Sequence, residues 1–225
     1  VSNGGVSNSD KETFERAREI IIGLYHSRII KDFLPAVVDN EVLDPLLEGF
    51  RDGALPEDNI RWSEAPDMPV EFSAAAYRFG HSMIREDYQL NGEDKAVIEL
   101  FDIGGFDRVP RFFNLDFDFF FSNPDRNPLM ARKIDTKITP SLLDLPKRIA
   151  ENPSNLAVRN LIRGKVFQLP SGETIANDHF NGNQIETPNP ITALQLEGQT
   201  PLWFYILAEA EQNDGKLGTV GGNIV

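Results

Sequence analysis

The chain has 225 residues, of which 40% are hydrophobic and 25% charged, which is enough apolar material for a folded core. It contains no cysteine, so disulfides, thiolate metal sites and a cysteine nucleophile are excluded. A net charge of −13 gives a surface that repels phosphate backbones, so we expect no nucleic-acid partner, and an anionic ligand would need locally placed arginines.

No apolar run approaches the roughly 20 residues that span a bilayer, so we expect no membrane span. The first 20 residues lack the charged-then-apolar plan of a signal peptide and are interpreted as a flexible lead or a cut end. We expect a soluble chain, and secretion as part of a longer parent protein stays an open option.

The first predicted helix covers residues 10–34, with Asp10 as its cap. Apolar side chains recur along it at three- and four-residue steps: Phe14, Ala17, Ile21, Leu24 and Tyr25. Pro35 is expected to end this helix, because the residue before a proline avoids the helical region. A shorter helix over 40–50 and an exposed loop over 51–69 follow.

A second long helix is predicted from Pro69 to residue 86, because a first-turn proline and three consecutive alanines favour it. Gly80 costs about 1 kcal/mol there relative to alanine. It would be explained if something bulky and flat lay against the backbone beside His81. Residues 98–122 are rich in phenylalanine and broken by Gly104 and Gly105, and predict irregular structure with one short helix.

The stretches 127–146 and 155–180 alternate helical apolar spacing with proline and glycine stops. A final helix is predicted over 200–212, with Thr200 as cap and Pro201 at its first position. The fold class that follows is mainly α: an irregular multi-helix domain with long loops and few or no strands, with residues 1–225 forming a single domain.

On a continuous helix Arg78, His81 and Arg85 would share one stripe. A histidine that binds a metal must be neutral, and neighbouring cations lower its pKa. Arginines also pair with carboxylates in bidentate fashion, which suits the edge of an anionic cofactor. On these residues alone, a structural histidine with solvated arginines remains the commoner case.

A second segment, "RNLIRGKVFQLPSG", carries Asn160 and Arg163 on one helical face. Burying an asparagine is costly unless its amide is paired. The amide oxygen of Asn160 could accept the proton on the far nitrogen of a ligating histidine, which would fix the ring and its tautomer.

These segments, with "MPVEFSAAAYRFGHSMIREDYQLN" and "TPLWFYILAEAE", resemble the animal-type haem peroxidase superfamily of the peroxidase–cyclooxygenase type, in its bacterial branch. The resemblance implies haem b as cofactor, with His81 as the proximal iron ligand and Asn160 as its hydrogen-bond partner. Arg78 and Arg163 sit where the family keeps arginines near the haem propionates. It further implies a peroxidase-type oxidoreductase that uses peroxide and a reducing substrate, as in oxidative-stress chemistry.

The family's distal signature, glycine–glutamine followed by aspartate–histidine–aspartate, is absent from the sequence, and so is its calcium loop. We therefore interpret the chain as the C-terminal, proximal-side part of a longer haem peroxidase domain. Peroxide cleavage needs a base and a cation on the distal face, so turnover by this chain alone should be poor. The alternative is a haem-free helical binding or scaffold module derived from a peroxidase.

In the cyclooxygenase-like branch a tyrosine stands three residues before the proximal histidine, where this chain has Arg78. Fatty-acid oxygenation is therefore disfavoured. His26 and His179 are expected to be ordinary helix and loop histidines. Asp116 and Asp118 are too few oxygens for a calcium site.

Overall fold

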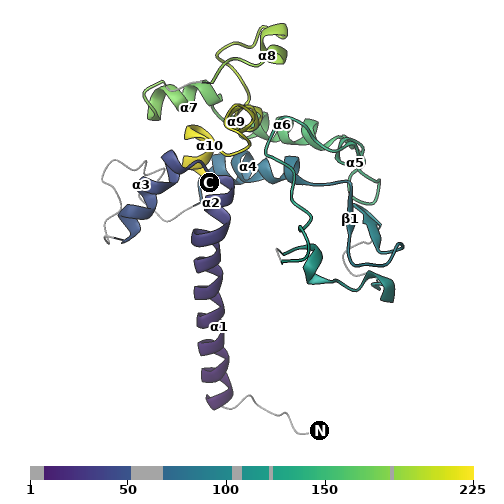
Figure 1. Ribbon diagram of the computed structural model, residues 1–225. Helices are drawn as coiled ribbons and strands as arrows, with labels where there is room; N and C mark the ends of the chain where they lie inside the picture. Colours follow the sequence, from purple (N-terminus) through teal and green to yellow (C-terminus); the bar gives the residue numbers. More distant parts are fainter. Residues whose placement is uncertain (1–7, 52–67, 103–107, 122–123, 183–184) are drawn as a thin grey trace.

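The computed structural model describes residues 8–51, 68–102, 108–121, 124–182 and 185–225 (Figure 1). Helices dominate these residues, and the only sheet among them pairs two three-residue strands, β1 (Asp87–Gln89) and β2 (Val97–Glu99), in antiparallel register. The prediction of a mainly α domain with long irregular connections is therefore confirmed. Most of the loop predicted over 51–69 lies outside the described residues, as do Gly104 and Gly105.

The hydrophobic core surrounds α9 (Leu202–Gln212), whose apolar side chains are buried on all sides. A helix that is apolar all round is stable only when other elements cover every face. Those elements are α10 (Thr219–Ile224), α7 (Gly172–His179), α6 (Leu156–Val166) and the segment 76–83. The helix begins after Pro201 rather than at it. Thr200, expected to cap α9, instead donates its hydroxyl to Glu173.

The C-terminal segment is tied to the start of the chain. Leu217 N donates to Val37 O at 2.8 Å, and Asp39 N donates to Leu217 O at 2.9 Å. Val37 ends α2 (Leu34–Val37), and the chain continues into α3 (Asn40–Arg51), which packs on α10. Segments from both ends of the sequence therefore close one core.

The prediction that the first helix ends at Pro35 is wrong. The chain runs from α1 (Asn8–Arg28) through the π-helical turn η1 (Ile29–Phe33) into α2 without leaving the helical region. Leu34 N donates to Ile29 O, five residues back. This wider turn lets Pro35 occupy the first turn of α2, where its missing N–H is not needed.

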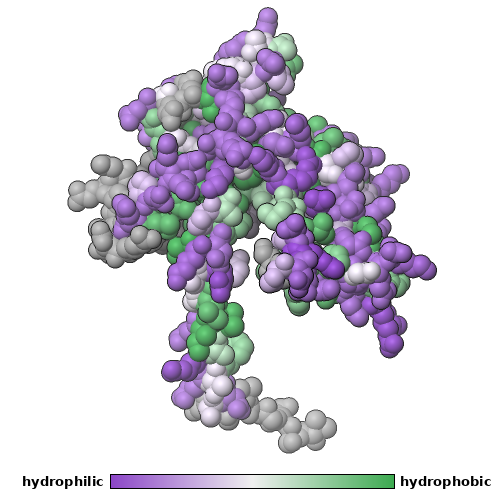
Figure 2. Space-filling model, viewed as in Figure 1, coloured by the Kyte–Doolittle hydropathy of each residue, from purple (hydrophilic) through white to green (hydrophobic). Residues whose placement is uncertain are grey.

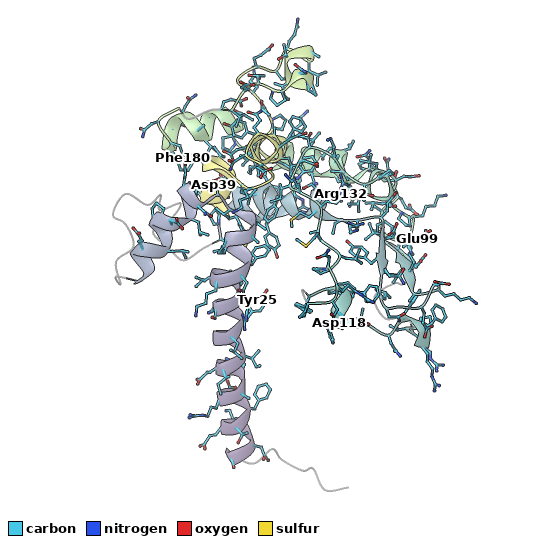
Figure 3. The ribbon with its side chains drawn as sticks, viewed as in Figure 1. Tyr25, Asp39, Glu99, Asp118, Arg132 and Phe180 are labelled. Carbon is cyan, nitrogen blue, oxygen red and sulfur yellow. The ribbon has the colours of Figure 1, made fainter. Side chains whose placement is uncertain are left out.

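Helix α1 extends away from the rest of the molecule (Figure 1), and Tyr25 lies on its surface (Figure 3). The apolar residues that predicted it remain exposed, Phe14 at 63% and Ile21 at 64%. Figure 2 shows this apolar surface as green atoms along the helix. The periodicity thus predicted a helix correctly, although the described residues do not bury its apolar face.

The prediction of one helix from Pro69 to 86 is also wrong. Helix α4 (Val70–Ala74) ends at Ala75, and the chain tightens into the 3₁₀ helix η2 (Ala76–Met83). Ala74, Ala75 and Ala76 are fully buried, so packing rather than helical propensity decides their conformation. After Met83 the chain becomes extended and enters β1.

The phenylalanine-rich segment forms two 3₁₀ turns, η3 (Arg111–Phe113) and η4 (Phe117–Phe119), instead of the one short helix expected. Phe117 and Phe121 are both 65% exposed, so these aromatics do not form a core of their own. Downstream, the short helix α5 (Pro140–Leu143) packs in a small separate cluster, and α8 (Asn189–Ala193) lies between α7 and α9 in the sequence.

Candidate functional site

The 3₁₀ geometry of η2 sorts its side chains into columns. With three residues per turn, residues three apart lie in line along the helix. Ala76, Phe79 and Ser82 form one column, and all three are buried. Arg78 and His81 form another column, which is only half-buried. The tight helix therefore places an arginine directly one turn before the histidine.

One hydrogen bond stabilises η2 internally, and a second joins it to α9. Ser82 Oγ donates to Phe79 O at 2.9 Å inside the buried column. The indole Nε1 of Trp203, on α9, donates to Arg78 O at 3.4 Å. The backbone that carries His81 is thus held by the most buried helix of the fold.

Helix α6 brings Asn160 to His81. The helix begins where the side chain of Asn155 accepts the N–H of Val158 at 3.0 Å, as an N-cap asparagine does. Asn160 lies in the second turn and is 2% exposed. Its Nδ2 lies 3.1 Å from Nδ1 of His81, across 79 residues of sequence. The two side chains that the sequence analysis singled out are therefore in contact.

The end of the amide that faces the ring decides what the histidine can do. As the side chains lie, Asn160 Nδ2 donates to Nδ1 of His81, so the neutral ring carries its hydrogen on Nε2. Turning the amide over places Oδ1 at the same point, because both ends of a carboxamide have nearly the same shape. Nδ1–H then donates to the amide, and Nε2 offers a lone pair to a metal. The sequence analysis expected this second arrangement.

Burial, and then the nearby Arg78 guanidinium, hold the pKa of the His81 ring below its ordinary value. The ring is therefore kept neutral near pH 7. Burial, and then Arg163, also lower the pKa of the Arg78 guanidinium. A neutral imidazole beside uncompensated positive charge is a suitable environment for a metal ligand and for an anionic group.

Arg163 was predicted to share a helical face with Asn160, and Arg85 was predicted to share the stripe of Arg78 and His81. Arg163 lies on α6 one turn after Asn160, exposed and close enough to Arg78 to influence it. Arg85 follows the end of η2, so it does not share the column of Arg78 and His81. Its Nη1 donates instead to Met130 O at 3.2 Å. The predicted three-residue stripe is therefore reduced to Arg78 and His81.

Two features of the site fit a flat, carboxylate-bearing group such as haem. A Cβ added at Gly80 would meet no atom of the described residues within 4 Å, so these residues leave open space next to the backbone beside His81. Nε of Arg78 is buried and has no hydrogen-bond partner in the described part of the chain. A buried donor without an acceptor is costly, and a ligand carboxylate would satisfy it.

The remaining histidines lie elsewhere, His26 exposed on α1 and His179 exposed at the end of α7. Within the described ranges no group of three or more histidines and acids could hold a metal ion, and no helix is long and apolar enough to cross a membrane. Asp116 uses its carboxylate to accept the N–H of Asp118 at 3.0 Å, as a local helix cap. A cavity of about 670 Å³ lies at Asp39 and Glu209, and His81 does not line it.

The sequence model of the family described as animal haem peroxidase matches residues 5–179. This span covers more than half of the chain and includes the whole of η2 and α6. The chain belongs to the animal haem peroxidase family. The resemblance stated from the sequence is thereby confirmed at the level of the superfamily, while the bacterial branch stays a prediction.

Two curated peroxidases are similar to part of this family member. It is 29% identical over 101 residues to heme peroxidase 2 of Caenorhabditis elegans and 30% identical over 98 residues to the chorion peroxidase of Drosophila melanogaster. Each alignment covers 43% of the chain but only 13% and 12% of the respective relatives. No solved structure matches the chain.

The sequence analysis missed the part that Trp203 plays at this site. The residue was noted only as part of the last helix, and the 125 positions between it and Arg78 hide their contact. It also missed Arg159, which precedes Asn160 on α6 and donates from Nη1 to Pro153 O at 3.2 Å. Helical spacing at three and four residues would have placed Arg159 beside Arg163.

Proposed function

We propose that this chain binds haem b through His81 and forms the proximal side of a peroxidase, which oxidises a reducing substrate at the expense of peroxide. The observation that carries the proposal is the contact between Asn160 and the Nδ1 edge of a neutral, half-buried His81. Membership of the animal haem peroxidase family supports it. We also propose that residues 1–225 form one domain that is the C-terminal part of a longer peroxidase domain.

In this proposal each residue of the site has a separate task. His81 supplies Nε2 to the iron, and Asn160 accepts the Nδ1 proton, so that the ring is oriented and its basicity rises. Arg78 and Arg163 pair with the haem carboxylates, and the orphaned Nε of Arg78 finds its acceptor there. Trp203 holds the turn that carries both Arg78 and His81.

Haem would supply the redox-active iron at which peroxide is activated. The chain's own residues would bind and orient the haem and hold a proton at Nδ1 of His81. None of them is assigned to the transfer of a proton between the oxygens of peroxide. That task needs a base and a cation on the opposite face. Full peroxidase activity is therefore proposed for a longer protein and not for these residues alone.

A haem-free scaffold is the second candidate, and one observation favours it. With Asn160 Nδ2 donating to Nδ1, the neutral His81 ring carries hydrogen on Nε2 and is closed to iron. In a scaffold this hydrogen bond would simply join η2 to α6. The two candidates thus differ in one amide rotation, which haem binding would drive.

The test is titration of the purified chain with haem, followed by its absorption spectrum in the Soret region. We expect saturable binding with one haem per chain. His81→Ala should weaken that binding at least about tenfold, because a metal–ligand bond is lost. Circular dichroism of the variant checks that the helices are retained.

The matched control is His26→Ala, which removes an exposed histidine from α1. It should leave both the spectrum and the affinity unchanged. Equal haem affinities for the parent chain and His81→Ala would contradict the proposed function and leave the scaffold as the better account.

A further inference from the structure

A groove of about 450 Å³ runs along one face of α6. Six of its lining residues recur at three- and four-residue steps: Leu156, Arg159, Asn160, Arg163, Val166 and Phe167. At 1.5 Å per residue the groove follows the helix for roughly 16 Å. Arg78 closes it from η2, next to Asn160. The groove therefore begins beside the His81 site and continues beyond it.

The charged side chains that line this groove in the described residues are all positive. Arg78, Arg159 and Arg163 line it, and no aspartate or glutamate does so among the described residues. None of these three guanidiniums forms an ion pair with another described residue. Three unpaired arginines side by side are unusual in a protein with a net charge of −13. Mutual repulsion of the guanidiniums would be relieved by an anion between them.

Arg159 is placed to hold such an anion together with Arg163. Its Nη1 donates to Pro153 O at 3.2 Å, which fixes the guanidinium at the end of the groove near the start of α6. Arg163 lies four residues later, so the two β-carbons are separated by about 5–6 Å. An anionic group of one to three oxygens can contact both side chains at this spacing.

Apolar side chains complete the groove. Val166 is 71% exposed, Phe167 50% and Ile162 46%, and they flank the arginines on the same helix. Inorganic phosphate would leave this surface in water. A ligand with an apolar body and one anionic group would cover it and satisfy the arginines together.

We propose that the α6 groove binds a small organic anion, with its carboxylate between Arg159 and Arg163 and its apolar body on Ile162, Val166 and Phe167. Because the groove adjoins the site of His81, this anion is the class of reducing substrate that we assign to the peroxidase. The substrate role rests on the proposed function; the binding does not.

The experiment titrates the haem-free chain with 2-naphthoate, an aromatic carboxylate, and follows backbone amide signals by NMR. Binding should shift the signals of α6, and the neutral analogue 2-naphthalenemethanol should bind at least about fivefold more weakly. Arg159→Gln should weaken naphthoate binding by about fivefold, as expected when an exposed ion pair is lost. The side chain is exposed, so the substitution is compatible with folding.

Lys165→Gln is the matched control, because it removes one positive charge from the same helix but lines the neighbouring cavity instead. It should change the affinity less than twofold. A second variant, Val166→Glu, brings a negative charge to the exposed apolar end of the groove and should weaken binding at least as much as Arg159→Gln.

Equal naphthoate affinities in the parent chain and Arg159→Gln would overturn the proposal. So would equal affinities for the neutral analogue, or a larger loss in Lys165→Gln. Repeating the titration with haem bound tests the overlap at Arg163, which is also assigned to a haem carboxylate: naphthoate should still bind through Arg159, with an affinity lowered severalfold. Loss of naphthoate binding on haem loading would mean that the groove only extends the haem site. Failure of haem to bind would leave the first titration unaffected.

Discussion

The lack of a side chain at Gly80 bears on which ligand can bind beside His81. Alanine would be the better helix former at this position, and no atom in the described ranges would obstruct its β-carbon. The absence of a side chain is therefore unexplained by the packing of the described residues. It is explained if a flat group lies against this part of η2.

Gly80→Ala should separate folding from haem binding. In the haem-free chain the substitution should raise the free energy of unfolding by up to about 1 kcal/mol, because alanine loses less backbone entropy. The same methyl group should lower haem affinity severalfold, because it occupies the space next to His81. Urea unfolding and haem titration measure the two effects. An unchanged haem affinity would show that nothing approaches Gly80.

Glu209, a buried carboxylate on α9, gives a pH-dependent prediction. Its carboxylate accepts the N–H groups of Val220 and Gly221, each at 2.8 Å. Burial raises the pKa of the Glu209 carboxyl, although the backbone N–H groups of Gly221, Val220 and Gly218 oppose this. A raised pKa in the folded state gives stability that is present below the ordinary glutamate value and is lost as the pH rises.

Glu209→Gln should therefore be compared with the parent chain at pH 5 and pH 8. The glutamine presents an N–H to one of the backbone donors, so the variant should be less stable by about 1–3 kcal/mol. The stability difference between the two proteins should be larger at pH 5, where the parent carboxyl is closer to protonation. Chemical denaturation at each pH gives this difference, and a smaller difference at pH 5 would contradict the assignment.

Particular residues could be predicted from the sequence to different degrees. His81, Arg78 and Asn160 were found because helical spacing and a family resemblance selected them. The end of the amide that meets Nδ1 could not be predicted, since it depends on a side-chain rotation. Trp203 could not be found either, because its partner is a backbone carbonyl far away in the sequence.

At the scale of elements, η2 differs most from its prediction. Three alanines favour an α-helix when propensity alone decides. In the fold all three are buried, and close packing against neighbouring elements, with Trp203 bonded to Arg78 O, changes the helix type at Ala75. The change matters for the site, because it aligns Arg78 with His81 and leaves Arg85 in the extended chain. Burial of this kind is not visible in the sequence.

Helix α1 was predicted from its apolar spacing, yet that spacing is not used for packing within the described residues. We predict that Ile21→Ala, at a side chain 64% exposed, changes the free energy of unfolding by no more than about 0.5 kcal/mol.

The matched substitution Ile206→Ala, at a side chain 1% exposed in α9, should cost about 2–4 kcal/mol. Denaturant unfolding of both variants compares the two helices. A cost at Ile21 similar to that at Ile206 would mean that α1 packs on the protein in solution.

At the scale of the whole molecule, α9 and its neighbours support a site assembled from two distant segments. The family match includes η2 and α6, whereas α9 and α10 lie after residue 179, where the match ends. The mainly α class followed from helical spacing and from frequent proline and glycine stops. The backbone hydrogen bond between Leu217 and Val37 could not be predicted, because pairing between residues far apart in the sequence leaves no local signal.

The most direct test of the account is resonance Raman spectroscopy of the haem-loaded, reduced chain, which detects the bond between iron and a histidine nitrogen. We predict an iron–imidazole stretching band that shifts when the protein is labelled with ¹⁵N-histidine. The band should vanish in His81→Gly and return when free imidazole is added. A band that persists in His81→Gly without added imidazole would contradict ligation by His81.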